Sequence, residues 1–283
     1  MDKSAGSGDF LAEMSASSRQ RVSLARAQLG DAEIMARAAD TPTPPRLQLS
    51  ARRFDLIAEV KFRSPAAGQL RAGSEEQVNA RVAGYAEAGA AVVSVLTEPS
   101  RFDGTLAHLK TAVRALDGRI PAMRKDFLVD PYQVCEARLF GAGGVLIIVR
   151  MLDDATAGAL IECASRLKMF ALLETFDEGD IARAAALVKQ YSSSAELLVG
   201  VNCRDLTTLE VVPGRLEELV RSLPSNVPRV AESGVATAQD AGRIAIAGYD
   251  VALVGSALMN ALEPLQLVRS MLSAARTERA RRS

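Results

Sequence analysis

Short apolar runs alternate with longer amphipathic segments along most of this chain of 283 residues. Each apolar run has the length of a strand buried on both faces, and each following segment carries apolar residues at helical spacing. The expected strands cover residues 56–61, 91–96, 120–124, 144–149, 169–174, 197–202, 228–232 and 251–254. Eight strands, each followed by a helix, predict an α/β fold, the (β/α)8 TIM barrel, whose typical length is about 250 residues.

The main alternative architecture is an open, doubly wound parallel sheet, which also alternates strands and helices. Such sheets commonly bind a dinucleotide through a GxGxxG sequence after the first strand, and no such sequence follows residue 61 here. The even spacing of the eight units also favours the barrel.

The chain begins with a segment that does not belong to this alternation. Residues 9–30 and 32–38 have the apolar spacing of two helices, and the proline-rich residues 41–45 break the helix. We therefore expect residues 1–50 to form an N-terminal helical extension and connector, and residues 51–283 to form the barrel. A closing helix is expected over 264–275, and the basic tail 276–282 predicts a solvated helix end.

Composition excludes several classes of function. Lys and Arg together number 34, as do Asp and Glu, so no global charge attracts nucleic acid or a membrane surface. No apolar run approaches the roughly 18 residues that span a bilayer. The three cysteines are far apart in sequence and there is one histidine, which argues against a zinc site or a disulfide framework and favours the cytoplasm.

Charged and polar residues gather where the expected strands end. In a barrel these carboxyl ends share one face, which is where catalytic residues collect. Two lysines, three glutamates, an asparagine and an arginine fall at such ends: Glu59, Lys61, Lys125, Glu174, Asn202, Arg204 and Glu232. Such a convergent set predicts an active site at this mouth.

Two loops indicate a phosphate site. Ser233-Gly234 and Gly255-Ser256 follow the seventh and eighth strands, the usual phosphate position in TIM barrels. Glycine lets the backbone N–H groups approach an anion, and the serine hydroxyls add donors. The pair of loops therefore predicts a small phosphorylated substrate.

The chain resembles the indole-3-glycerol phosphate synthase family of tryptophan biosynthesis. The similar segments are IAEVKFRSP (57–65), SVLTEPSRFDG (94–104), RKDFLVDPYQV (124–134), LLET (172–175), VGVNCRDL (199–206), VAESGV (230–235) and ALVGSALM (252–259). The resemblance implies a decarboxylating carbon–carbon lyase that cyclises 1-(2-carboxyphenylamino)-1-deoxyribulose 5-phosphate with loss of carbon dioxide and water. It implies no metal and no organic cofactor, and it leaves open an association with other enzymes of the pathway.

The resemblance also assigns catalytic roles. Lys125 is expected to be the general acid of ring closure, and Glu174 the acid–base partner in dehydration. Lys61 and Glu59 are expected against the reacting carbons and the anthranilate carboxylate, while Asn202 orients hydroxyls or the neighbouring glutamate. From the residues alone, Glu174 and Glu232 are also compatible with simple salt-bridge partners of the lysines.

The remaining site residues are expected to hold the substrate. By resemblance, phosphate is bound by Ser64, Gly234, Gly255 and Ser256. The rest of the substrate is expected to contact Arg204, Ser64, Pro65, Phe102, Phe127, Leu146, Ile148, Leu206, Glu232 and Ser233. His108 lies in an expected helix far from the strand ends, which favours a structural role.

Some residues depart from the family pattern. Phe62, Ala66 and Ala67 stand where much of the family has polar or basic residues, which puts the phosphate contacts in doubt. Two alternatives stay open: a specialised or non-catalytic paralogue that binds a related anthranilate-derived phosphosugar, and another phosphosugar barrel such as phosphoribosylanthranilate isomerase. The isomerase reaction requires a Cys/Asp acid–base pair, which Glu59 and Lys61 do not supply.

Overall fold

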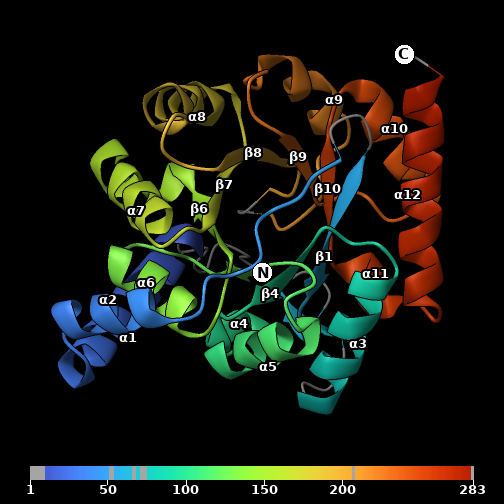
Figure 1. Ribbon diagram of the computed structural model, residues 1–283. Coiled ribbons are helices and arrows are strands. Elements are labelled where there is room, and N and C mark those ends of the chain that lie inside the picture. Colours follow the sequence, from blue (N-terminus) through green and yellow to red (C-terminus); the bar gives the residue numbers. More distant parts are fainter. Residues whose placement is uncertain (1–9, 51–53, 66–67, 71–74, 206–207, 282–283) are drawn as a thin grey trace, which may run out of the picture.

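The computed structural model describes residues 10–50, 54–65, 68–70, 75–205 and 208–281 (Figure 1). Within this part of the chain, eight parallel strands close into a barrel in the order β1-β10-β9-β8-β7-β6-β5-β4. The strands are β1 (Asp55–Val60), β4 (Val92–Leu96), β5 (Ala122–Lys125), β6 (Gly144–Ile148), β7 (Phe170–Thr175), β8 (Leu197–Asn202), β9 (Arg229–Glu232) and β10 (Val251–Val254). The predicted (β/α)8 barrel is confirmed.

Helices surround the barrel, as Figure 1 shows. They are α3 (Glu75–Glu87), α5 (Leu106–Leu116), α6 (Pro131–Leu139), α7 (Asp154–Arg166), α8 (Glu178–Tyr191), α9 (Arg215–Leu219), α10 (Ala238–Ala247) and α12 (Pro264–Ala280). The 3-10 helix η2 (Val220–Ser222) directly continues α9. Short elements that the sequence did not predict lie in the loops: β2 (Arg63–Ser64), β3 (Gly68–Gln69), α4 (Pro99–Phe102), η1 (Val149–Met151) and α11 (Ser256–Asn260).

Side-chain caps fix where several of these helices begin. Asp130, Asp153 and Asp177 accept hydrogen bonds from backbone N–H groups in the first turns of α6, α7 and α8. Thr237 forms a capping box with Asp240 at the start of α10. Such caps satisfy N–H groups that a helix leaves unpaired, so the loops between strand and helix have defined ends.

The strands are buried on both faces because each alternates residues between two apolar clusters. Ile57 points into the barrel interior, together with Met123, Leu172 and Leu198. Residues on the other side of the strands, such as Leu56, pack against the surrounding helices. This alternation also fixes which residues face the mouth, because the inward-facing side chains continue to the carboxyl ends of the strands.

The N-terminal segment contacts both ends of the barrel. Helix α1 (Phe10–Gln28) places Phe10 and Met14 on the interior cluster, and α2 (Asp31–Asp40) lies beside α6 (Figure 1). After α2 the connector approaches the start of β6, where Pro44 lies next to Gly143. Leu47 then packs on the same interior cluster. The predicted helical extension is therefore present and closely joined to the barrel.

The prediction of a solvated C-terminal tail is wrong for Arg276 and Arg279, although Arg281 is exposed. Helix α12 continues to Ala280, and Arg276 pairs with Asp55 at 3.1 Å while bonding to the Phe54 carbonyl at 3.0 Å. Arg279 pairs with Asp250 at 2.6 Å. These arginines tie α12 to the starts of β1 and β10, a tertiary contact that the basic composition of the tail did not indicate.

The cysteines are closer in space than in sequence. The sulfur atoms of Cys135 in α6 and Cys163 in α7 lie 3.7 Å apart, and all three cysteines are buried and free. In the described ranges, no helix combines the length and apolar character that crossing a bilayer requires.

Candidate active site

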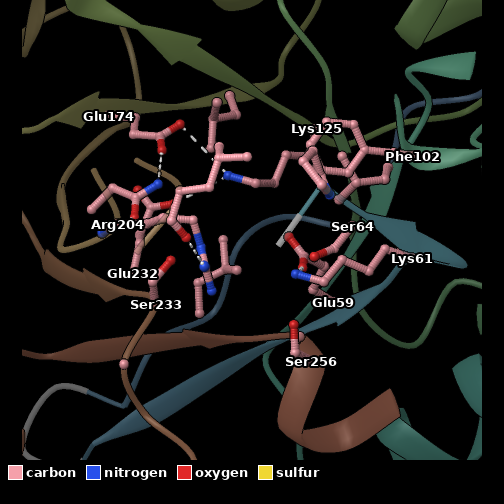
Figure 2. A pocket seen from close by; sticks show the side chains of 18 of the residues that line it. Glu59, Lys61, Ser64, Phe102, Lys125, Glu174, Arg204, Glu232, Ser233 and Ser256 are labelled. Atoms are coloured by element: carbon pink, nitrogen blue, oxygen red, sulfur yellow. Dashed lines mark hydrogen bonds and ion pairs between the residues drawn. The ribbon is translucent and has the colours of Figure 1, made fainter. Parts of the chain in front are cut away.

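The candidate active site lies in the mouth of the barrel, directly above the apolar interior. The inward rows of the strands continue from Ile57 to Glu59, from Met123 to Lys125 and from Leu172 to Glu174. These charged groups line one pocket with Asn202, Arg204 and Glu232, and Figure 2 shows them converging from different strands. The structure thus brings together the strand-end residues that the sequence predicted.

Lys125 lies between two glutamates in the pocket. Its Nζ lies 3.3 Å from Glu232 Oε2 and 3.6 Å from Glu174 Oε2. Glu232 Oε1 is buried and has no hydrogen-bond partner among the described residues. Glu232 therefore pairs with the lysine through one oxygen, while the other oxygen is enclosed beside Gly200, where a Cβ atom would lie 2.4 Å from it.

Glu59 and Lys61 form a second ion pair on the other side of the pocket. Lys61 Nζ lies 2.6 Å from Glu59 Oε1, and the two side chains project side by side (Figure 2). Gly255 passes close beside this pair: a Cβ atom at its position would lie 2.0 Å from Glu59 Oε1 and 3.0 Å from Lys61 Nζ. Glycine at 255 is required here by space, since its φ of −120° suits any residue.

Asn202 joins Glu174 to the following loop. Its side-chain amide donates a hydrogen bond to Glu174 Oε1, and its Oδ1 accepts one from the Arg204 backbone N–H at 2.9 Å. The Arg204 guanidinium bonds to the Leu209 carbonyl at 2.5 Å and lines the pocket. This chain of contacts holds the Glu174 carboxylate in one orientation.

Burial and neighbouring charges shift the pKa values of three of these groups. Burial alone would lower the pKa of Lys125, but Glu174, Glu232 and Glu59 outweigh it and raise that pKa. Burial and the nearby Glu174 raise the pKa of Glu232 to about 8 in spite of Lys125. Burial alone would raise the pKa of Glu59, but Lys61 and Lys125 hold it below its usual value. The mouth therefore contains both ionised and protonated groups near neutral pH.

The loops predicted to bind phosphate also meet at this pocket. Ser233 and Gly234 both have positive φ, 65° and 70°, and a Cβ atom at Gly234 would lie 2.7 Å from the Cys203 sulfur. Ser64 and Ser256 line the pocket on the side of Glu59 and Lys61 (Figure 2). The serines from three loops thus surround one polar edge of the cavity.

Part of the cavity wall is apolar. The Phe102 and Phe127 rings lie 6.1 Å apart, and Pro65, Leu146 and Ile148 also line the pocket. Leu206, which was predicted to belong to this wall, lies outside the described residues. Ala66 and Ala67 lie outside them as well. Phe62 is buried against His108, with ring centroids 4.9 Å apart, so the residue after Lys61 packs away from solvent.

Several pocket residues were not predicted from the sequence: Phe10, Leu96, Phe176, Val211, Leu253 and Asn260. Phe10 comes from α1, and its ring contacts Phe127 at a centroid distance of 5.7 Å. The apolar face of the 9–30 helix was the signal for its burial, but no local pattern indicates which surface that face covers. The described residues contain no group of three or more His, Cys, Asp or Glu side chains arranged to hold a metal ion.

Comparison with known proteins identifies the family. A family model described as indole-3-glycerol phosphate synthase matches residues 11–271. The protein of that name from Parafrankia sp. (strain EAN1pec) is 43% identical over 226 residues, covering 80% of each chain. The chain belongs to the indole-3-glycerol phosphate synthase family. A second relative with this name, from Mycobacterium ulcerans (strain Agy99), is 40% identical over 258 residues, covering 90% of this chain and 91% of its own.

Several solved structures with low sequence identity resemble this family member in fold alone. The 3-hexulose-6-phosphate synthase from Salmonella typhimurium superposes with a TM-score of 0.62 at 15% identity, covering 80% of this chain and all (100%) of its own. The thiamine phosphate pyrophosphorylase from Pyrococcus furiosus gives a TM-score of 0.58 at 16% identity, covering 80% and 98%. These likenesses agree with the barrel, and they carry no argument about the reaction.

Proposed function

We propose that this chain converts 1-(2-carboxyphenylamino)-1-deoxyribulose 5-phosphate into indole-3-glycerol phosphate, carbon dioxide and water. The observation that supports this most directly is the Lys125 ammonium, held between Glu174 and Glu232 in a pocket that also carries the Glu59–Lys61 pair and an aromatic wall. Membership of the indole-3-glycerol phosphate synthase family supports the same reaction, whereas no observation favours a non-catalytic paralogue.

Lys125 acts as the general acid of ring closure in this proposal. The ring carbon that bears the carboxylate attacks the ketone carbon, and the carbonyl π electrons move to oxygen, which takes a proton from Lys125. The neighbouring glutamates raise the pKa of Lys125, so the ammonium is present at neutral pH to donate that proton. General acid–base participation of this kind is typically worth about 10² to 10⁴ in rate.

The apolar wall assists the loss of carbon dioxide. When the carbon–carboxylate bond breaks, its electrons return to the ring and the negative charge disperses. A carboxylate held among Phe102, Phe127 and Leu146 is poorly solvated, which favours this dispersal. Lys61 and Glu59 line the same pocket, where they contact the edge of this carboxylate and the reacting carbons.

Glu174 serves the final dehydration. The hydroxyl formed at ring closure leaves as water, and a proton is lost from the carbon next to nitrogen. Asn202 fixes the orientation of Glu174, so that this carboxylate can exchange a proton with the substrate as Lys125 supplies or accepts another. Glu232 and Ser233 bind substrate hydroxyls, since both line the pocket beside Lys125 and Glu174.

The serine and glycine loops bind the phosphate. Backbone N–H groups at Gly234 and Gly255 approach closely because neither residue has a side chain, and Ser64 and Ser256 add hydroxyl donors. Arg204 supplies positive charge at the same end of the substrate.

Two broader features belong to the same proposal. We take residues 1–50 as an extension to the barrel of residues 51–283, because α1 and α2 precede β1 and do not belong to the alternation of strands and helices. A cytoplasmic location is supported by three free cysteines, which persist in a reducing compartment.

The test is an assay of the purified chain with this substrate, in the presence of EDTA, that records the fluorescence of the indole product. Turnover near or above about 1 s⁻¹ would support the proposal and its independence of metal. Substrate binding without any product would contradict it and would favour the non-catalytic paralogue.

A further inference from the structure

Helix α1 is joined to the segment that carries Lys125 by a buried polar network. The two Arg21 guanidinium nitrogens bond to the two oxygens of Asp126, at 3.0 and 2.8 Å. Ser18, one turn earlier in α1, donates a hydrogen bond to the Phe127 carbonyl. Two of the residues that α1 contacts, Asp126 and Phe127, thus directly follow Lys125.

The Asp126 carboxylate is enclosed and fully bonded. Besides Arg21 it accepts hydrogen bonds from Arg124 at 3.0 Å, from the Thr97 hydroxyl at 2.7 Å and from the Phe127 N–H at 2.8 Å. Burial alone would raise the pKa of Asp126, but Arg124 and Arg21 together hold it well below its usual range. Arg124 remains a cationic partner of Asp126 when Arg21 is replaced, whereas Arg21 is the partner that joins Asp126 to α1.

We propose that Arg21 is a positioning residue of the active site, which fixes the segment 125–127 through Asp126 and so keeps Lys125 Nζ between Glu174 and Glu232. This inference rests on the proposed function for its kinetic part. Its basis is that a bidentate arginine–carboxylate pair defines both distance and orientation. A displacement of about 1 Å at a reacting group can cost about 10²-fold in rate.

The same helix offers a matched control. Arg26, also in α1, pairs with Asp130 at 2.8 Å and with Asp31 at 2.9 Å, and its guanidinium lies over the Tyr132 ring. It joins α1 to the start of α6 without contacting Asp126. Arg26→Met therefore weakens the docking of α1, whereas Arg21→Met also frees the segment behind Lys125.

The kinetic test compares these two variants after circular dichroism has confirmed that each is folded. We expect Arg21→Met to lower kcat by 10- to 100-fold with KM within about threefold, and Arg26→Met to stay within twofold of the unchanged chain. Arg21→Lys retains the charge and loses the paired guanidinium donors, so this variant should recover part of the lost kcat. Equal kcat values for Arg21→Met and Arg26→Met would overturn the inference.

A second measurement does not depend on activity. Hydrogen–deuterium exchange should show at least tenfold faster exchange of the amides in 125–129 for Arg21→Met than for Arg26→Met, because the bonds through Asp126 protect this segment. Equal exchange in the two variants would overturn the positioning role, even if the unchanged chain formed no product. Failure of the proposed function would instead appear as an inactive unchanged chain whose exchange still differs between the variants.

Discussion

The mouth of the barrel carries charged side chains of both signs. Lys61, Lys125 and Arg204 supply three cations. The carboxylates of Glu59 and Asp126 line the same pocket, and their pKa values lie below the ordinary value because neighbouring cations outweigh burial. Burial and the nearby Glu174 raise the pKa of Glu232 to about 8, which disfavours its charged form at pH 7. A ligand that carries both a carboxylate and a phosphate can pair with the cations of this pocket.

The raised pKa of Glu232 gives a pH-dependent stability. The unfolded chain loses this proton near pH 4.5, the ordinary value, and the folded chain keeps it up to about pH 8. The folded state binds more protons between these values, so the free energy of unfolding falls as the pH rises through this window. Glu232→Gln, which cannot ionise, should remove this contribution, on the order of 1 kcal/mol per pH unit at its steepest.

Urea unfolding of the unchanged chain and of Glu232→Gln at several pH values between 5 and 8 measures this difference. Glu178→Gln, a change at an exposed residue at the start of α8, is the control and should follow the unchanged chain. Parallel stability curves for Glu232→Gln and the unchanged chain would show that Glu232 is ionised throughout the window.

The connection between β10 and α11 lies beside both the Glu59–Lys61 pair and the expected phosphate site. Gly255 passes beside the Glu59–Lys61 pair, and Ser256, the first residue of α11, lines the pocket. The loop therefore determines both the position of one ion pair and the surroundings of the expected phosphate. Gly255 and Ser256 can be tested separately.

Gly255→Ala should displace the Glu59 carboxylate and break its pairing with Lys61. The added methyl group would lie 2.0 Å from Glu59 Oε1, far inside van der Waals contact. We expect steady-state kinetics to show kcat lower by about 10²-fold. Gly30→Ala is the control, because a Cβ atom there meets nothing within 4 Å. Near-normal turnover of Gly255→Ala would show that the geometry of the Glu59–Lys61 pair is not needed for catalysis.

Ser256→Asp should weaken substrate binding through repulsion between the new carboxylate and the phosphate. We expect KM to rise about tenfold or more with a smaller change in kcat, since the phosphate is bound but is not changed by the reaction. Ser222→Asp adds the same charge at an exposed residue of η2 and should leave KM unchanged. An unaltered KM in Ser256→Asp would place the phosphate elsewhere.

At the scale of the whole molecule, the sequence predicted what depends on local periodicity. The eight strands could be found because each is a short apolar run, and the barrel followed from their repetition. The alternation of side chains within a strand then predicted which residues face the mouth. Glu59 and Glu174 lie two residues beyond the inward-facing Ile57 and Leu172. Their convergence in one pocket is a consequence of closing the barrel.

Contacts between distant segments could not be predicted in this way. Arg21 and Asp126 are 105 residues apart, and Arg276 and Asp55 are 221 apart. The sequence around each of these residues predicts an ordinary exposed charge. The partner of each is decided only by how α1 or α12 docks on the barrel. The same holds for Phe10, whose helix was predicted but whose place in the pocket depends on how that helix crosses the mouth.

In the proposed reaction, Lys125 donates the proton that drives ring closure. The most direct measurement follows carbon dioxide release and indole formation together, in the unchanged chain and in Lys125→Met. We expect one carbon dioxide per indole product in the unchanged chain, and a rate at least about 10²-fold lower in Lys125→Met with its fold and substrate affinity retained. A folded Lys125→Met that forms product at nearly the normal rate would contradict this assignment.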